Sequence, residues 1–206
     1  RVFSAITEML VHGADAGANA GEFAKNMKIP EADESILANL QEKIEAPLHR
    51  PKGLKPAEVR RSVQEAAHKN LSPIRNKEEL ESFIGFLKSI RVNELANLAT
   101  TSKSRIYNKE WLDALELENI CSLLEMAAQS ALQRTESRGV HYREDFPHTD
   151  NDNWLQESIV KKTASGYEIS KRPVTVGSMT PPQGVTPYLD FIAKMMKSHS
   201  DTGGKH

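Results

Sequence analysis

The sequence is poor in cysteine, in long apolar runs and in net charge. Its single cysteine, Cys121, excludes an internal disulfide and a cysteine-built zinc site. No run approaches the roughly 18 apolar residues of a membrane span, and no secretory signal pattern opens the chain. Lys plus Arg is 27 and Asp plus Glu is 28, and this balance argues against a nucleic-acid-binding surface. The chain begins at Arg1 rather than Met, so we expect a trimmed or processed piece of a longer protein.

Fingerprints of nucleotide binding and of hydrolysis are also missing. There is no Gly-x-Gly-x-x-Gly pattern, no phosphate loop and no Gly-x-Ser-x-Gly elbow. We therefore expect that the chain cannot hold a cofactor by itself.

The sequence does contain helical periodicity, with apolar residues recurring every three or four positions between proline and glycine breaks. The last three predicted helices have lengths typical of an antiparallel three-helix bundle. Partial alternation around Ala164-Ser165-Gly166 predicts one β-hairpin, before a short helix and a polar tail from Ser198. The predicted fold is mainly α, with a small C-terminal β-hairpin. The predicted helices cover 3–27, 33–46, 56–69, 76–98, 108–138 and 188–197, and the predicted strands cover 154–162 and 167–176.

The first predicted helix carries Gly13, Gly17 and Gly21 four residues apart, which places them in one stripe. Glycine inside a helix costs up to about 1 kcal/mol, so the stripe indicates that something packs very closely. Another helix is the commoner explanation, and a flat ligand is the alternative.

Cys121 lies within the apolar part of the helix predicted over 108–138, so we interpret it as a core residue rather than a nucleophile. The other predicted core positions of the helices over 76–98 and 108–138 are Leu80, Phe83, Ile84, Leu87, Ile90, Trp111, Leu115, Leu117, Ile120, Leu124, Ala127, Ala128 and Ala131.

Arginine, histidine and carboxylates concentrate in residues 134–154, and three interpretations compete. A metal site would use His141, Asp145 and His148, but their spacing is irregular and no helix frames them. A catalytic acid–base pair would need a pocket. A structural ion cluster at a helix end is favoured, because arginine's planar fork suits buried carboxylates and carbonyls. Its predicted members are Arg134, Glu136, Arg138, His141, Arg143 and Asp145, with Arg134 and Arg138 one helical turn apart.

The same stretch resembles the C-terminal region of succinate dehydrogenase and fumarate reductase flavoprotein subunits. Residues 134–147 read R-T-E-S-R-G-V-H-Y-R-E-D-F-P, and Asn153-Trp154 follows. Residues 108–119 are similar to the family's N-x-E-L-x-x-A-L-E-L-x-N helix, and Arg172-Pro173-Val174 matches the end of its hairpin. Residues 4–17 resemble the last helix of its FAD-binding domain. L-Aspartate oxidases share a shorter form of the block, but the Arg143-Glu144-Asp145 run favours the succinate/fumarate branch.

The resemblance implies roles for the first helix. Ala5 and Ile6 fall on positions whose backbone contacts the flavin of FAD, where the positive end of a helix dipole would favour reduced, anionic flavin. The family carries a substrate-carboxylate arginine four residues before the position of Ser4, whereas Arg1 stands three before it. Either one residue is missing or Arg1 is not that arginine. The family's catalytic residues would lie upstream, so none is expected in this chain.

From the resemblance we expect a C-terminal fragment of an FAD-dependent subunit that interconverts succinate and fumarate, inactive and free of flavin alone. Expected partners are the upstream FAD-binding domain, a C4 dicarboxylate and an iron–sulfur subunit, in the cytoplasm or at the cytoplasmic face of a membrane. The alternatives are a standalone helical interaction module and the C-terminal domain of an L-aspartate oxidase-like flavoenzyme. The predicted domains are 1–28 (end of the FAD-binding domain), 29–54 (linker and helix), 55–153 (bundle) and 154–206 (hairpin, helix and tail).

Overall fold

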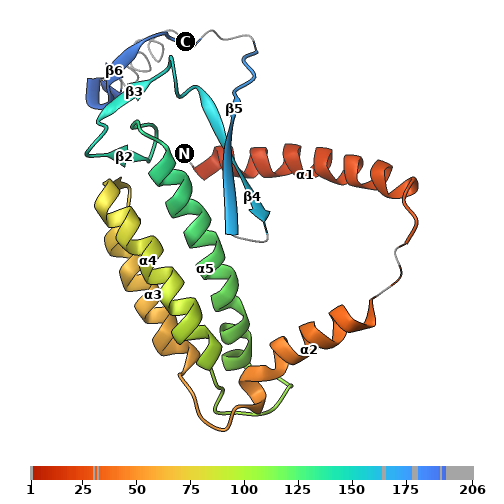
Figure 1. Ribbon diagram of the computed structural model, residues 1–206. Helices are drawn as coiled ribbons and strands as arrows, with labels where there is room; N and C mark the ends of the chain where they lie inside the picture. The colour runs from red at the N-terminus through yellow and green to blue at the C-terminus, as the bar shows by residue number, and fades with distance from the viewer. Residues whose placement is uncertain are drawn as a thin grey trace. The chain divides into compact units, whose positions relative to one another are not determined.

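The computed structural model describes residues 2–29, 31, 33–163, 166–177, 181–190 and 192–193. The chain divides into two compact units, Arg1–Lys43 and Ile44–His206. Helices dominate the described residues (Figure 1), which confirms the prediction of a mainly α chain. The helices are α1 (Val2–Lys25), α2 (Glu34–His49), α3 (Pro56–Asn70), α4 (Lys77–Asn93), the 3-10 turn η1 (Leu95–Asn97) and α5 (Lys109–Gln133). The strands are β1 (Ile74–Arg75), β2 (Tyr142–Arg143), β3 (His148–Asp150), β4 (Gln156–Thr163), β5 (Gly166–Pro173) and β6 (Val185–Pro187).

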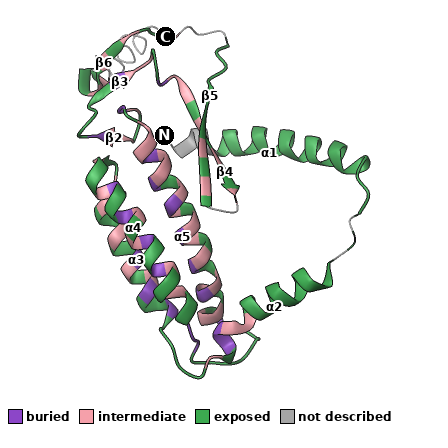
Figure 2. Ribbon diagram, viewed as in Figure 1, coloured by how far each residue is buried: buried purple, intermediate pink, exposed green. Residues whose placement is uncertain are grey.

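The first unit consists of α1 and the beginning of α2, and its described side chains are all exposed (Figure 2). Large apolar side chains are among them: Leu10 is 69% exposed and Phe23 is 68% exposed. A Cβ added to Gly13, Gly17 or Gly21 would meet no heavy atom within 4 Å. The stripe of small residues therefore makes no close contact within its own unit.

The second unit is organised around α3, α4 and α5, each of which packs against the other two. Successive helices of the three run in opposite directions (Figure 1). Their inward faces are buried (Figure 2) and form one apolar core. The core includes Val59, Val63, Leu80, Phe83, Leu87, Ile90, Leu98, Ala114, Leu117, Cys121, Ala128 and Ala131.

Cys121 is fully buried in this core, as predicted. Burial raises the pKa of its thiol to about 11, so the sulfur stays protonated at neutral pH and packs as a small apolar group.

Local signals explain where the bundle helices begin. The Asn76 side chain accepts a hydrogen bond from the backbone N–H of Glu79 at 3.0 Å and caps α4. Asn108 caps α5 in the same way, accepting from Trp111 N at 3.1 Å. Pro56 occupies the first turn of α3, where a missing N–H costs no helical hydrogen bond.

Two helix ends differ from the sequence prediction. Helix α2 was expected to end at Ala46, but it continues through Pro47 to His49. Pro47 and Leu48 are buried, and the Pro47 carbonyl accepts from Thr100 N at 3.0 Å, so packing on the bundle favours the extra turn. Helix α4 ends at Asn93 rather than near Leu98, and η1 follows it.

The loops at one end of the bundle lie side by side. Leu54 N donates to Asn97 O at 2.9 Å, and Ala99 N donates to Leu54 O at 3.0 Å. Gly53 permits this approach, because a Cβ there would lie 2.8 Å from the Ala99 Cβ and would clash with the Asn97 carbonyl.

Short sheets gather at the other end. Strands β4 and β5 pair antiparallel from Gln156↔Pro173 to Thr163↔Gly166. The sequence patterns did not indicate the parallel pair β1–β2 or the antiparallel pair β3–β6. The predicted helix over 188–197 is described only at 188–190 and 192–193, and the predicted tail from Ser198 lies outside the described residues.

Candidate functional site

The charged stretch 134–154 begins where α5 ends, at Gln133. The prediction that the helix extends to Arg138 is wrong, so Arg134 and Arg138 are not one helical turn apart. Arg134 adopts an extended backbone (φ −78°, ψ 106°) while its N–H still donates to Ser130 O at 3.2 Å. The chain turns away because the side chains that follow bind the end of the helix and one another.

Glu136 is the centre of one half of this ionic network. Its side chain is fully buried and forms ion pairs with Arg134 and Arg138. Arg138 binds it with a two-pronged contact, Nε to Oε1 at 2.8 Å and Nη2 to Oε2 at 2.9 Å. The backbone N–H of Asp150 donates to the same carboxylate at 2.8 Å. One buried negative charge is thus shared by two guanidinium groups, which is the condition under which burying it is tolerated.

Arg143 is the centre of the other half and is 1% exposed. Its Nη1 donates to the carbonyls of Ala131 (2.9 Å), Leu132 (3.1 Å) and Arg134 (3.1 Å). These carbonyls lie at the C-terminal end of α5, where the helix leaves acceptors unpaired and carries partial negative charge. Arg143 therefore caps α5 with a positive charge from a residue outside the helix.

Asp145 connects Arg143 to a second helix end. It accepts from Arg143 Nε at 2.7 Å and Nη2 at 2.6 Å, and its Oδ2 accepts from the backbone N–H of Lys77 at 3.2 Å. Lys77 is the first residue of α4, so the carboxylate lies at the positive end of that helix. The hydrogen bonds from Arg143 lower the pKa of Asp145 below its ordinary value. The Arg143–Asp145 pair thus joins the end of α5 to the beginning of α4.

His141 lies between these groups but binds none of them through its ring. Nε2 is buried without a hydrogen-bond partner among the described residues, while the backbone pairs with Arg138 at 2.8 and 3.0 Å. Burial lowers the pKa of the ring to about 4, with a further contribution from the positive charge of Arg75. The histidine is therefore neutral at physiological pH.

This geometry does not favour the two chemical interpretations of the stretch. No group of three His, Cys, Asp or Glu side chains in the described part of the chain is arranged to hold a metal ion. Asp145 is occupied by Arg143, and His148 is exposed. Both carboxylates at the centre of the network already accept from guanidinium groups, so neither is free to act as a base.

Trp154 attaches the hairpin to the network, a contact that the sequence pattern did not indicate. The guanidinium of Arg134 lies 5.0 Å from the Trp154 ring centroid and Lys171 Nζ lies 3.5 Å from it. The indole N–H donates to Thr135 Oγ1 at 3.1 Å, and Arg134 Nη2 donates to Gln156 O at 2.5 Å. A buried tryptophan after a polar turn is the signal that would have indicated an anchor.

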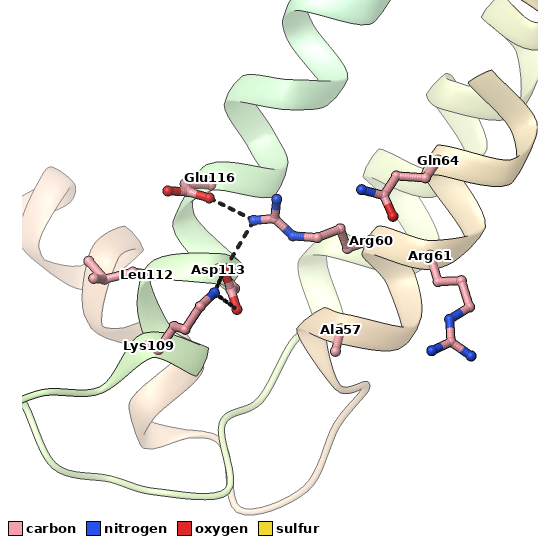
Figure 3. Close-up of a pocket in the computed structure, with 8 residues that line it drawn as sticks. All are labelled: Ala57, Arg60, Arg61, Gln64, Lys109, Leu112, Asp113 and Glu116. Atoms are coloured by element: carbon pink, nitrogen blue, oxygen red, sulfur yellow. Dashed lines mark hydrogen bonds and ion pairs between the residues drawn. The ribbon is translucent and has the colours of Figure 1, made fainter. Parts of the chain in front are cut away.

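A pocket of about 440 Å³ lies elsewhere, between the N-terminal ends of α3 and α5 (Figure 3). Arg60 reaches from α3 to Asp113 at 3.2 Å and Glu116 at 2.7 Å, and Lys109 binds Asp113 at 2.8 Å. Arg61 points away from α5 (Figure 3). Since carboxylates of α5 already neutralise Arg60 and Lys109, we assign this pocket no ligand.

Among the residues tied to flavin and substrate, only part can be placed. Ile6 lies in the first turns of α1 and is 55% exposed. Ala5 belongs to the same helix, but its side chain lies outside the described part of the chain, as does all of Arg1. Among the described residues, no helix is both long enough and apolar enough to cross a membrane.

The helical bundle and the ionic network that joins its helix ends define a class of C-terminal helical domain. The chain belongs to the fumarate reductase flavoprotein C-terminal family, whose model matches residues 60–186. This confirms the resemblance found in the sequence.

Individual relatives agree with that assignment. The chain is 27% identical over 182 residues to a succinate dehydrogenase flavoprotein subunit of Rickettsia felis, covering 86% of this chain and 30% of the relative. It is 32% identical over 159 residues to a polypeptide of the fumarate reductase (CoM/CoB) of Methanothermobacter marburgensis, covering 77% and 28%. The chain thus spans about 30% of the length of these relatives.

Solved structures share the fold. The Mycobacterium smegmatis Sdh1 complex matches with a TM-score of 0.73 at 23% identity, over 84% of this chain and 30% of that chain. An E. coli quinol fumarate reductase matches with a TM-score of 0.72 at 23% identity, over 82% and 29%.

Proposed function

We propose that this chain is the C-terminal part of an FAD-dependent subunit that interconverts succinate and fumarate. The family match over residues 60–186 carries the proposal, because it covers the bundle helices and the whole ionic network. The relatives are named as succinate dehydrogenase and fumarate reductase flavoproteins, which are oxidoreductases. The shorter L-aspartate oxidase form of the motif is less well matched by the Arg143-Glu144-Asp145 run.

The role proposed for the second unit is structural support of the FAD domain. Its core and its network hold the ends of α4 and α5 in a fixed relation without help from any other segment. A rigid bundle of this kind positions the segments attached to it, and it needs no catalytic residue of its own.

The role proposed for α1 is to contact the flavin from one edge. The first turn of α1 contains no acidic side chain, so its N–H groups are not neutralised by a neighbouring carboxylate. Ile6 is exposed and apolar, and the glycine stripe leaves open space beside the helix. These features fit the backbone of Ala5 and Ile6 against an isoalloxazine edge, with FAD supplying hydride transfer when bound in the whole subunit.

The remaining assignments follow from the same proposal. Arg1 is the candidate for the substrate-carboxylate arginine, and a C4 dicarboxylate is the candidate substrate. The proposed partners are an upstream FAD-binding domain and an iron–sulfur subunit, at the cytoplasmic face of a membrane. Neighbouring structures described as complexes support such an assembly.

The proposal is tested by titrating the chain with FAD and following flavin absorbance and fluorescence. We expect no tight binding, because the described residues provide a helix edge rather than an enclosed site. Tight binding by this chain alone would overturn the fragment assignment. The gene gives an independent test: a reading frame that continues upstream of the Arg1 codon into a dinucleotide-binding fold supports the proposal, whereas a start codon there supports a standalone interaction module.

A further inference from the structure

The bundle end opposite the ionic network has an uneven distribution of charge. Residues 46–57 and 95–109 contain no aspartate or glutamate. They contain six basic residues, Arg50, Lys52, Lys55, Lys103, Arg105 and Lys109. The two segments touch, because Leu54 pairs with Asn97 and Ala99 through backbone hydrogen bonds and Lys103 Nζ donates to Arg50 O at 2.6 Å. Six positive charges are therefore brought to one end of the bundle.

Most of these charges meet no carboxylate. Arg50 Nη1 donates to the carbonyl of Leu98 at 2.7 Å, and Lys103 donates to the carbonyls of Arg50 and Thr100. Lys52 and Lys55 are exposed and make no side-chain hydrogen bond or ion pair with the described residues. Only Arg105, with Glu45, and Lys109, with Asp113, have an acidic partner. Four of the six charges are left for an external group.

The same end displays two apolar side chains at the tip of the loop between η1 and α5. Ile106 is 74% exposed and the Tyr107 side chain extends fully into solvent. Tyr107 has φ 52°, the one positive φ at a non-glycine residue in the described part of the chain. A bulky residue in this region is strained, and such strain persists where the surrounding structure enforces it.

The loop enforces that conformation with its own hydrogen bonds. Asn108 Nδ2 donates to the carbonyls of Ser102 and Ser104, each at 2.9 Å. Ser104 Oγ donates to Ile106 O at 3.1 Å and accepts from Ile106 N at 3.0 Å. Arg105 is held by Glu45 at 2.7 Å. The tip is therefore ordered before anything binds to it, which reduces the entropic cost of docking.

We propose that Arg50, Lys52, Lys55, Lys103, Ile106 and Tyr107 form a basic docking tip for an acidic segment of a partner protein. Carboxylates of the segment would meet the four unpaired cations, and an apolar side chain would meet Tyr107 and Ile106. A protein partner suits a tip of fixed geometry. One isoleucine and one tyrosine bury too little apolar surface to hold a chain on a bilayer, and a single aromatic provides no stacking platform for nucleic acid. This inference is independent of the proposed oxidoreductase function.

The test uses the whole chain and a short fluorescein-labelled peptide that alternates glutamate and leucine, followed by fluorescence anisotropy at low salt. We expect binding that weakens by about tenfold in Lys52→Glu/Lys55→Glu and weakens further at high salt. The matched control Lys88→Glu/Lys162→Glu makes the same charge change at exposed lysines on α4 and β4 and should bind as the parent chain does.

Tyr107→Gly separates binding from folding. Glycine adopts a positive φ without strain, so this variant should melt at the same or a higher temperature while binding the peptide several-fold more weakly. The proposal is overturned if Tyr107→Gly and Lys52→Glu/Lys55→Glu bind the peptide as tightly as the parent chain. It is also overturned if vesicles containing phosphatidylserine bind the chain more tightly than the peptide does, because a lipid surface would then be the better occupant.

Discussion

The two units of this chain differ in what covers their apolar side chains. In the second unit the apolar faces of α3, α4 and α5 cover one another, and Leu80, Phe83 and Leu87 are completely buried. In the first unit every described side chain is exposed, although α1 carries Met9, Leu10 and Phe23. Similar side chains are thus core residues in one unit and surface residues in the other.

This difference shows which part of the chain can fold by its own contacts. A bundle with a closed core gains free energy from its own burial, whereas a single exposed helix has little beyond intrinsic propensity. Three glycines in α1 lower that propensity further. The first unit therefore has the character of a segment whose stability comes from another body, as the proposed FAD-domain role requires.

A matched pair of phenylalanines gives the largest expected contrast. Phe83→Ala in α4 should lower the free energy of unfolding by about 3–5 kcal/mol, because it leaves a cavity in a closed core. Phe23→Ala in α1 removes the same atoms from an exposed site and should change it by less than about 0.5 kcal/mol. Urea unfolding followed by circular dichroism measures both, and equal effects would contradict the division of the chain into a closed and an open unit.

The next effect concerns the cap that joins the helix ends. Arg143→Ala should destabilise the bundle by about 3 kcal/mol, because three α5 carbonyls and Asp145 lose a buried guanidinium. Arg143→Lys keeps the charge but not the planar fork, so we expect an intermediate loss. If the alanine and lysine variants unfold at the parent's urea concentration, the network does not hold the helices together.

Arg138→Ala should have a smaller effect, about 1–2 kcal/mol. Its guanidinium is partly exposed, and Arg134 remains to pair with Glu136. Thermal melting monitors this variant, with Arg172→Ala as a control that removes an exposed hairpin ion pair. An unchanged melting temperature for Arg138→Ala would count against a structural role for the pair.

The smallest expected effect is a pH dependence. Burial lowers the pKa of His141 to about 4 from its ordinary value of 6.5. The unfolded chain therefore takes up a proton first, so the stability that the neutral ring contributes is complete above pH 6.5 and is lost as pH falls toward 4. Since the ring is only partly buried, we expect a loss of about 1 kcal/mol.

His141→Gln is the corresponding variant, and its unfolding free energy should depend less on pH between 6.5 and 4 than that of the parent chain. His12→Gln, which removes an exposed histidine from α1, is the control. Identical pH slopes for His141→Gln and the parent chain would show that His141 does not titrate with folding.

The bundle could be predicted from the sequence because its signals are local. Asparagine caps at Asn76 and Asn108 mark the beginnings of α4 and α5, and the spacing of Leu80, Phe83, Leu87 and Ile90 marks the buried face. The exposure of α1 could not be read in the same way, because its pattern also looks amphipathic and does not say whether a partner is present.

The details of the network depended on contacts between distant residues. Residue types indicated an ion cluster in 134–154, but the helix was expected to extend to Arg138. Nothing local shows that Arg143 would cap α5 or that Asp145 would reach Lys77. The strand pairs β1–β2 and β3–β6 are two or three residues long, too short to give a periodic pattern. Glu125 is likewise buried within the apolar face of α5 because Arg91 on α4 pairs with it.

The contrast between the two units is tested most directly by hydrogen exchange of the whole chain, read by mass spectrometry. Amides of α3, α4 and α5 should exchange only through global unfolding, whereas those of α1 should exchange orders of magnitude faster, because no closed core stabilises that helix. Slow exchange of α1 to the same degree as the bundle would contradict the account, since the first unit would then be stable by its own contacts.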